Sequence, residues 1–466
     1  MFRKALLYCC LLLSNHCLSF DGGEHALIAN LAFANGDFPR SNQITNLEKK
    51  IYFSYGELVA MAGDMYESVE EIALNDPKIL NGFFSRNRNS LKQCIASEID
   101  SINAQKEYSG CDDLRLASKK FKYVLLAHDN YKHFTWHNIK AYVEHHSNAL
   151  WFANLAFLKC DEEQKQQTPD LCIQRHEQFI AQIKDSNYKE KLKSKYRKFP
   201  KLFPRKSLSK LYLRSLPKNK LIDLALFENA FADHFLTDAF SAGHLRIPRS
   251  QIDFYVENYK KEASDGFSEG RAKSSTLSGA LTQLLHNSDG ALKGTQVINS
   301  LGNRFTVRSD KQLFSRVGEV KLTNDFANNK QLTYPVEAVT RSLNELFFVV
   351  KKGRTKHNEH IYSALELVPF VDSAKADPIV KVMSELIESK GSAKRLVDQM
   401  TPEMALIFKG LLLAEDSDYE IYLTEFITNI PTLMENLRAR IHLDAKDAEL
   451  KQRIPTPLLN GLLQIQ

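Results

Sequence analysis

Apolar residues recur along most of the chain at three- and four-residue spacing, with polar residues between them. This spacing puts the apolar side chains on one face of a helix, and it is clearest over residues 46–61, 141–158, 221–239 and 405–413. Prolines and glycines fall mostly between these segments, as expected at helix ends. The pattern therefore predicts a mainly α fold for a globular chain of 466 residues, of which 43% are hydrophobic and 25% charged.

One short stretch departs from the helical pattern. Residues 297–299 and 305–307 are rich in β-branched and aromatic side chains and flank Gly302-Asn303, which is typical of a hairpin. We therefore expect a small β element within residues 295–314. From Pro335 the helical spacing returns without a histidine cluster, so residues 335–466 are interpreted as a C-terminal accessory helical region after a first region at 20–334.

Residues 1–19 have the organisation of an export signal. Arg3 and Lys4 precede an apolar stretch, and small residues at Cys17 and Ser19 precede a cleavage point. We expect cleavage after Ser19 and a secreted or periplasmic protein, in preference to a buried N-terminal helix. Cleavage lowers the formal net charge from +6 to +4, because two cations and no acids are removed. No later apolar run reaches the roughly 18 residues that a membrane-spanning helix needs.

The cysteines that remain after the signal suit an exported protein. They are even in number, which favours disulfides, and the pairing that closes the shortest loops is Cys94 with Cys111 and Cys160 with Cys172. The competing interpretation, a zinc site made of all four cysteines, lacks the close CxxC pairs that such sites usually use.

A basic stretch lies between Lys184 and Lys220. It contains fourteen Lys or Arg residues against Asp185 and Glu190, and aromatic residues are interleaved with them. Such a stretch is either a solvated face or a surface that attracts anionic lipid headgroups or nucleic-acid phosphates. The sequence leaves both interpretations open.

The most informative residues for chemistry lie between 229 and 244. His234 and Asp238 are four residues apart, so on a helix their side chains share a face and converge on one ion. The small residues 241–243 then allow the chain to turn and aim His244 at the same place. A lone histidine on an apolar helix is more often a core residue, but further N and O donors occur in other segments: His25, Asp64, His133 and His286.

These motifs resemble, in this order, the zinc-dependent phospholipase C and S1/P1 nuclease superfamily. They are the Phe20–His25 stretch, Gly63-Asp64, His133-Phe134 and the HxxxDxxxxxH spacing that begins at His234. The stretch from Ala232 to His244 is most similar to the bacterial secreted phospholipase C branch. The resemblance covers about residues 20–313, and the HxxxDxxxxxH motif is its specific part.

The resemblance implies a mainly helical catalytic domain around three zinc ions, with ligands carried over one position at a time. Phe20 stands where the family has Trp, which is tolerable because its backbone atoms coordinate. Gly290 stands where the family has an acid, so Asp289 is taken as the substitute. The implied ligands are Asp64, His133, His234 and Asp238 for one zinc, Phe20, His25 and the bridging Asp238 for a second, and His244, His286 and Asp289 for the third.

The activity that the resemblance implies is phospholipase C, which hydrolyses the glycerol–phosphate ester of phospholipids to diacylglycerol and a phosphorylated headgroup. Zinc would offset the phosphodiester charge and lower the pKa of a bound water, and Asp64 would accept a proton. The expected partner is a phospholipid membrane surface, and no obligate protein partner is inferred. The alternatives are an S1/P1-type single-strand nuclease, whose partner would be nucleic acid, and a catalytically weak membrane-binding effector.

The expected start at Phe20 yields the first prediction. Protein that begins at Phe20 should bind about one more zinc per chain than protein with extra residues before it, because only a free amino group can chelate together with the Phe20 carbonyl. Phe20→Trp should be nearly neutral. Mass spectrometry of the exported protein identifies the start, and equal zinc content in the extended and mature forms would eliminate the N-terminal ligand.

Overall fold

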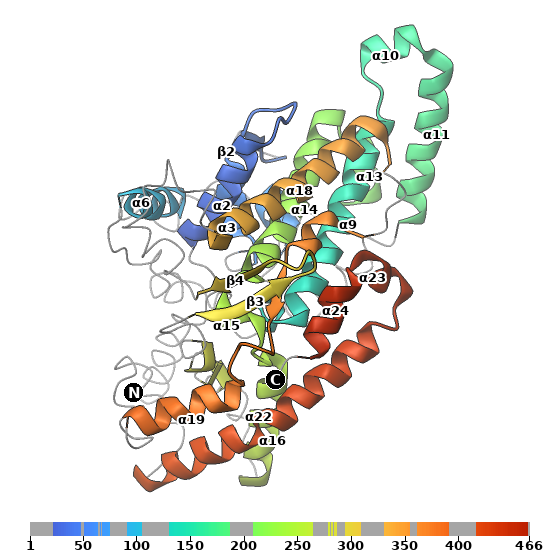
Figure 1. Ribbon diagram of the computed structural model, residues 1–466. Helices are drawn as coiled ribbons and strands as arrows, with labels where there is room; N and C mark the ends of the chain where they lie inside the picture. The colour runs from blue at the N-terminus through green and yellow to red at the C-terminus, as the bar shows by residue number, and fades with distance from the viewer. Residues whose placement is uncertain are drawn as a thin grey trace, which may run out of the picture.

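The computed structural model describes residues 22–47, 51–63, 66, 68–74, 91–104, 130–186, 208–263, 278–279, 281–282, 284–286, 294–308, 330–354, 361–390 and 416–464. The fold is mainly helical with two small antiparallel sheets, which confirms the expected fold class (Figure 1). The expected signal at 1–19 and the expected helix at 405–413 lie outside the described residues, as does most of the basic stretch, at 187–207.

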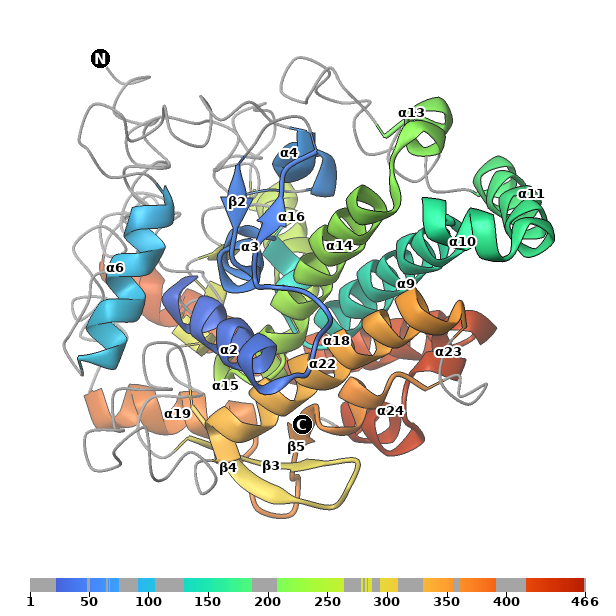
Figure 2. The ribbon, with the colours of Figure 1, turned by 90° about the horizontal axis from the view of Figure 1, so that it is seen from above.

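Three long helices lie side by side at the centre: α9 (Trp136–Leu158), α14 (Lys218–Asp238) and α18 (Lys330–Lys352) (Figures 1 and 2). The shorter helices α2 (Gly22–Asn35) and α3 (Tyr55–Met61) pack against them. From Asp223 to its end α14 has no exposed residue. Every polar side chain on that part of α14 therefore needs a partner inside the protein.

The remaining described elements surround this centre or extend from it. They are α4 (Val69–Leu74), α6 (Leu91–Asn103), η2 (Asn130–His133), α10 (Glu162–Gln167), α11 (Pro169–Asp185), α13 (Lys210–Ser215), α15 (Ala242–Leu245), α16 (Arg249–Ala263), η5 (Ser363–Glu366), α19 (Ile379–Lys390), α22 (Asp416–Asp444), α23 (Ala448–Arg453) and α24 (Thr456–Leu463).

The expected hairpin is present and forms part of a larger sheet. Strands β3 (Thr295–Asn299) and β4 (Arg304–Val307) pair antiparallel, with Val297 opposite Phe305. The Asn299 side chain accepts from the backbone N–H of Asn303 at 3.0 Å and helps to close the turn. A third strand, β5 (Pro369–Val371), pairs with the other edge of β3. This strand comes from the C-terminal region and was not anticipated.

The helix expected over 46–61 is shorter than the pattern predicts. Strands β1 (Ile44–Thr45) and β2 (Tyr52–Phe53) pair ahead of the helix, and among the described residues of 46–61 only those of α3 are helical. The Ser54 side chain accepts from the N–H of Glu57, whose side chain accepts from the N–H of Ser54. This reciprocal cap places the start of the helix at Tyr55. The expected helices at 141–158 and 221–239 lie within α9 and, to Asp238, α14.

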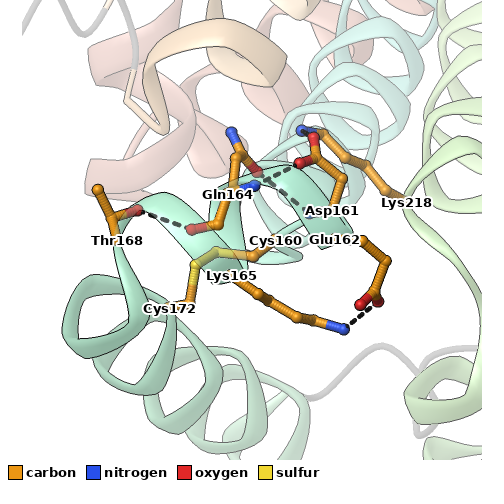
Figure 3. Close-up of a disulfide and its surroundings, with 8 residues drawn as sticks. All are labelled: Cys160, Asp161, Glu162, Gln164, Lys165, Thr168, Cys172 and Lys218. Atoms are coloured by element: carbon orange, nitrogen blue, oxygen red, sulfur yellow. Dashed lines mark hydrogen bonds and ion pairs between the residues drawn. A yellow bond between two sulfur atoms is a disulfide. The ribbon is translucent and has the colours of Figure 1, made fainter.

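Helices α10 and α11 project from the body, and the expected disulfide Cys160–Cys172 joins the connection between α9 and α10 to α11 (Figure 3). Asp161 accepts from the N–H of Gln164 at 2.9 Å and begins α10. Cys94 is also disulfide-bonded, and Cys111 lies outside the described residues. Disulfide bonding of these cysteines excludes a zinc site made of all four.

The C-terminal region is part of the same hydrophobic core as the preceding residues. The expected boundary between 334 and 335 falls inside α18, and the buried core extends without a break in packing from Ala26 to Leu462. Asp444 of α22 accepts from the indole N–H of Trp136 at 3.0 Å, and Lys140 lies 3.2 Å from the same carboxylate. The described part of 335–466 therefore supports α9 directly.

No described helix has the length and apolar character that crossing a membrane requires.

Asp444→Ala should destabilise the fold by about 1–3 kcal/mol, because it leaves the buried Trp136 indole N–H without its acceptor. The matched control is Glu162→Ala, which breaks an exposed ion pair with Lys165 and should cost less than about 0.5 kcal/mol. Urea unfolding of both variants measures the difference. Equal midpoints in the two variants would show that α22 contributes no such support.

Candidate metal centre

The last turn of α14 carries a group of buried donors. His234 and Asp238 lie one turn apart and are fully buried. His25, from the first turn of α2, is also fully buried, and His133, from the end of η2, is nearly so. Ligand atoms of His25, His234 and Asp238 all lie within 4.8 Å of one another, so this group could hold a metal ion.

The two oxygens of Asp238 face different histidines. Oδ2 lies 2.8 Å from His133 Nδ1 and 3.8 Å from His234 Nε2. His133 Nδ1 and His234 Nε2 are themselves 3.2 Å apart. These separations are near the roughly 3.3 Å edge of a tetrahedron around a zinc ion. Oδ1 lies 3.3 Å from His25 Nε2. The carboxylate thus presents one oxygen to His25 and the other to His133 and His234.

Hydrogen bonds to neighbouring groups fix which nitrogen of the His234 and His25 imidazoles carries the proton. His234 Nδ1 lies 3.0 Å from the carbonyl of Val59, which can only accept, so Nδ1 is the protonated nitrogen. His25 Nδ1 lies 2.6 Å from Thr237 Oγ1, whose own proton points to a helix carbonyl. The Nε2 lone pairs of both histidines therefore face Asp238.

The orientation of these donor atoms suits a bound cation better than it suits direct contact between the side chains alone. Asp238 Oδ1 makes no hydrogen bond to any described residue and faces the Nε2 lone pair of His25. Two acceptors at this distance repel each other, and a cation between them removes the repulsion. The residues present thus suit a divalent ion that takes N and O ligands.

Burial sets the charges of the group. Burial lowers the pKa of His234 well below its usual value, so this imidazole is neutral near pH 7. Burial alone would raise the pKa of Asp238, but the imidazoles of His234 and His133 hold it well below its usual range. An ionised carboxylate beside the neutral imidazole of His234 is the form in which these two groups bind metal.

The backbone before Asp64 touches this group. A Cβ on Gly63 would lie 2.5 Å from His234 Cδ2 and 3.1 Å from His133 Cε1. Gly63 also has a φ of +76°, which other residues rarely adopt. The position therefore requires glycine for both space and conformation. Asp64, the next residue, lies outside the described residues.

His244 and His286 form a second pair beside the first group. Their ring centroids are 5.1 Å apart with the rings perpendicular. His244 Nδ1 lies 2.6 Å from the carbonyl of His133, which fixes its Nδ1 as the donor and leaves Nε2 with a lone pair. The N–H of Thr135 donates back to the carbonyl of His244 at 2.7 Å, and the Phe134 ring stacks on the His244 ring.

The structure brings all six expected ligands that it describes into two adjacent groups. His25, His133, His234 and Asp238 share one buried group, and His244 and His286 form the adjacent pair. The other expected ligands, Phe20, Asp64 and Asp289, lie outside the described residues. Three neighbouring histidines have other partners: His137 bonds Ser250, His145 bonds Glu228, and His146 bonds Asn229 and Glu345.

A buried polar network behind the centre was not anticipated. The hydroxyl of Tyr55 donates to Asp233 Oδ2 at 2.6 Å, and the Asn229 amide donates to the same oxygen at 2.9 Å. Burial raises the pKa of Asp233 to about 7. Asn229 and Asp233 are four residues apart on α14, a spacing that marks a second polar stripe beside that of His234 and Asp238.

Comparison of the chain with protein-family models, with curated proteins and with solved structures finds no match. The interpretation of the centre therefore rests on its own geometry.

Asp238→Asn should abolish zinc binding at both groups of donors that its carboxylate faces, whereas His25→Ala should affect only one. The amide keeps the shape but lacks the charge and one acceptor oxygen. Elemental analysis, together with thermal unfolding with and without zinc, tests this. His145→Ala is the matched control, since His145 bonds Glu228 outside the group. Wild-type zinc content in Asp238→Asn would remove the bridging role.

Proposed function

We propose that this protein is an exported, zinc-dependent phosphodiester hydrolase that acts as a phospholipase C. The observation that supports the proposal is the Asp238 carboxylate, which presents one oxygen to His25 and the other to His133 and His234. A bridge of this kind suits closely spaced divalent cations, which are an effective means of neutralising a phosphodiester anion. The sequence resemblance described above points in the same direction.

The residues of the centre would hold the ions and orient them. His25 donates its Nδ1 proton to the Thr237 hydroxyl oxygen, and His234 donates its Nδ1 proton to the Val59 carbonyl. These hydrogen bonds fix the orientation of both rings and leave each Nε2 as the ligand atom. Zinc bound here would supply Lewis acidity and an activated water, so no protein nucleophile is needed. We assign Asp64 the role of proton acceptor, because it follows Gly63, whose backbone touches His234.

The proposed substrate is a phospholipid at a membrane surface, cleaved between glycerol and phosphate to give diacylglycerol and a phosphorylated headgroup. The basic stretch between Lys184 and Lys220 is consistent with attraction to anionic headgroups. The alternative substrate is single-stranded nucleic acid, which would use the same ions. A separable membrane-binding effector module in 335–466 gains no support from the fold, because the described part of this region belongs to the common core.

The deciding experiment compares hydrolysis of phosphatidylcholine vesicles and of single-stranded DNA by purified mature protein. We expect diacylglycerol release from vesicles and no DNA cleavage. His234→Ala should abolish the activity because it removes an ion ligand, and His145→Ala should retain it. Cleavage of DNA alone would establish the nuclease instead. Zinc-loaded protein that binds vesicles but hydrolyses neither substrate would overturn the enzymatic proposal.

A further inference from the structure

Arg249, at the start of α16, is one of the largest fully buried side chains in the described part of the chain. A buried guanidinium needs a charged partner. Its Nη1 lies 2.9 Å from Oδ1 of Asp253, one turn later on the same helix. The two opposite charges balance within α16, so the further hydrogen bonds of Arg249 and Asp253 can hold a different segment.

That segment is the short stretch that carries His286. Arg249 Nη1 donates to Thr282 Oγ1 at 3.1 Å, and the Ser278 hydroxyl donates to Asp253. The described residues between 278 and 286 are helical. Ser278, Thr282 and His286 follow at intervals of four, so they lie on one helical face. The Arg249–Asp253 pair therefore holds the face on which His286 lies.

The other side of His286 is fixed by close packing. The His286 ring rests on Gly243, where a Cβ would overlap the ring. This contact sets the ring beside His244, the next residue of α15. The ring position thus depends on the register of its segment against both α15 and α16. A rotation of that segment by one residue, about 100°, would carry His286 off Gly243.

We propose that Arg249, acting with Asp253 through Thr282, is a positioning residue that sets His286 against His244 so that the two imidazoles take one divalent cation. This inference rests on the metal centre proposed above. It assigns no contact between Arg249 and substrate. Arg249 acts only through the placement of His286.

The test uses the full mature chain and zinc alone, with chelator competition to resolve the affinities of the bound ions. Thr282→Val and Arg249→Lys should weaken one zinc by about 10–100-fold, as expected for loss of an outer-shell partner. The affected zinc should be the one lost in His286→Ala. Adding Thr282→Val to His286→Ala should weaken zinc binding no further. The zinc ions that depend on Asp238 should remain.

Thr306→Val is the matched control, because it removes a comparable side-chain bond, from Gln296, within the sheet. It should keep wild-type affinity for every zinc. If Arg249→Lys does not fold, Thr282→Val decides alone, since it keeps the shape of the side chain. Wild-type zinc binding in Thr282→Val, or equal weakening of all the ions, would overturn the inference. Hydrolysis is not measured, so a failed phospholipase assay leaves this result intact.

Discussion

The burial of one ionised carboxylate is the constraint on which the rest of the structure depends. Asp238 has no exposed surface, and a bare charge in such a place would be strongly destabilising. It is tolerated because donors converge on it from three other positions: His25, His133 and His234. The elements α2, η2 and α14 must therefore meet at one point, and their packing is the condition for the charge to exist there.

Helix α14 is held in the orientation that this packing requires by contacts on more than one of its faces. Its polar residues form two stripes: Asn229 and Asp233 bond Tyr55 of α3, while His234 and Asp238 face the candidate metal centre. Because neighbouring stripes are about 100° apart, anchoring one sets the direction of the other. The buried network behind the centre thus fixes the rotation of α14 about its own axis. It does so without taking part in the centre itself.

The local features of the fold and site could be predicted from the sequence, and the features that need distant contacts could not. The spacing of His234 and Asp238 and the hairpin around Gly302 follow from neighbouring residues. Strand β5 pairs only because Pro369–Val371 reaches β3, and residues 44–45 and 52–53 are strands because Ile44 pairs with Phe53 and Thr45 with Tyr52. The register of His286 depends on Arg249, which no local pattern identifies. The hydrogen bond from Trp136 to Asp444, which ties α22 to α9, is equally distant in the sequence.

The same long-range construction would couple metal binding to folding. Among the described donors, the most that one helical turn supplies is two, His234 and Asp238. The other donors come from segments as distant in the sequence as those of His25 and His286. An unfolded chain therefore has no site, and an ion that binds here stabilises only the assembled fold. The C-terminal region shares in this coupling, since Arg246, two residues after His244, donates to the carbonyl of Asp377 at 2.6 Å. Residues far from the centre thus help to determine whether it can form.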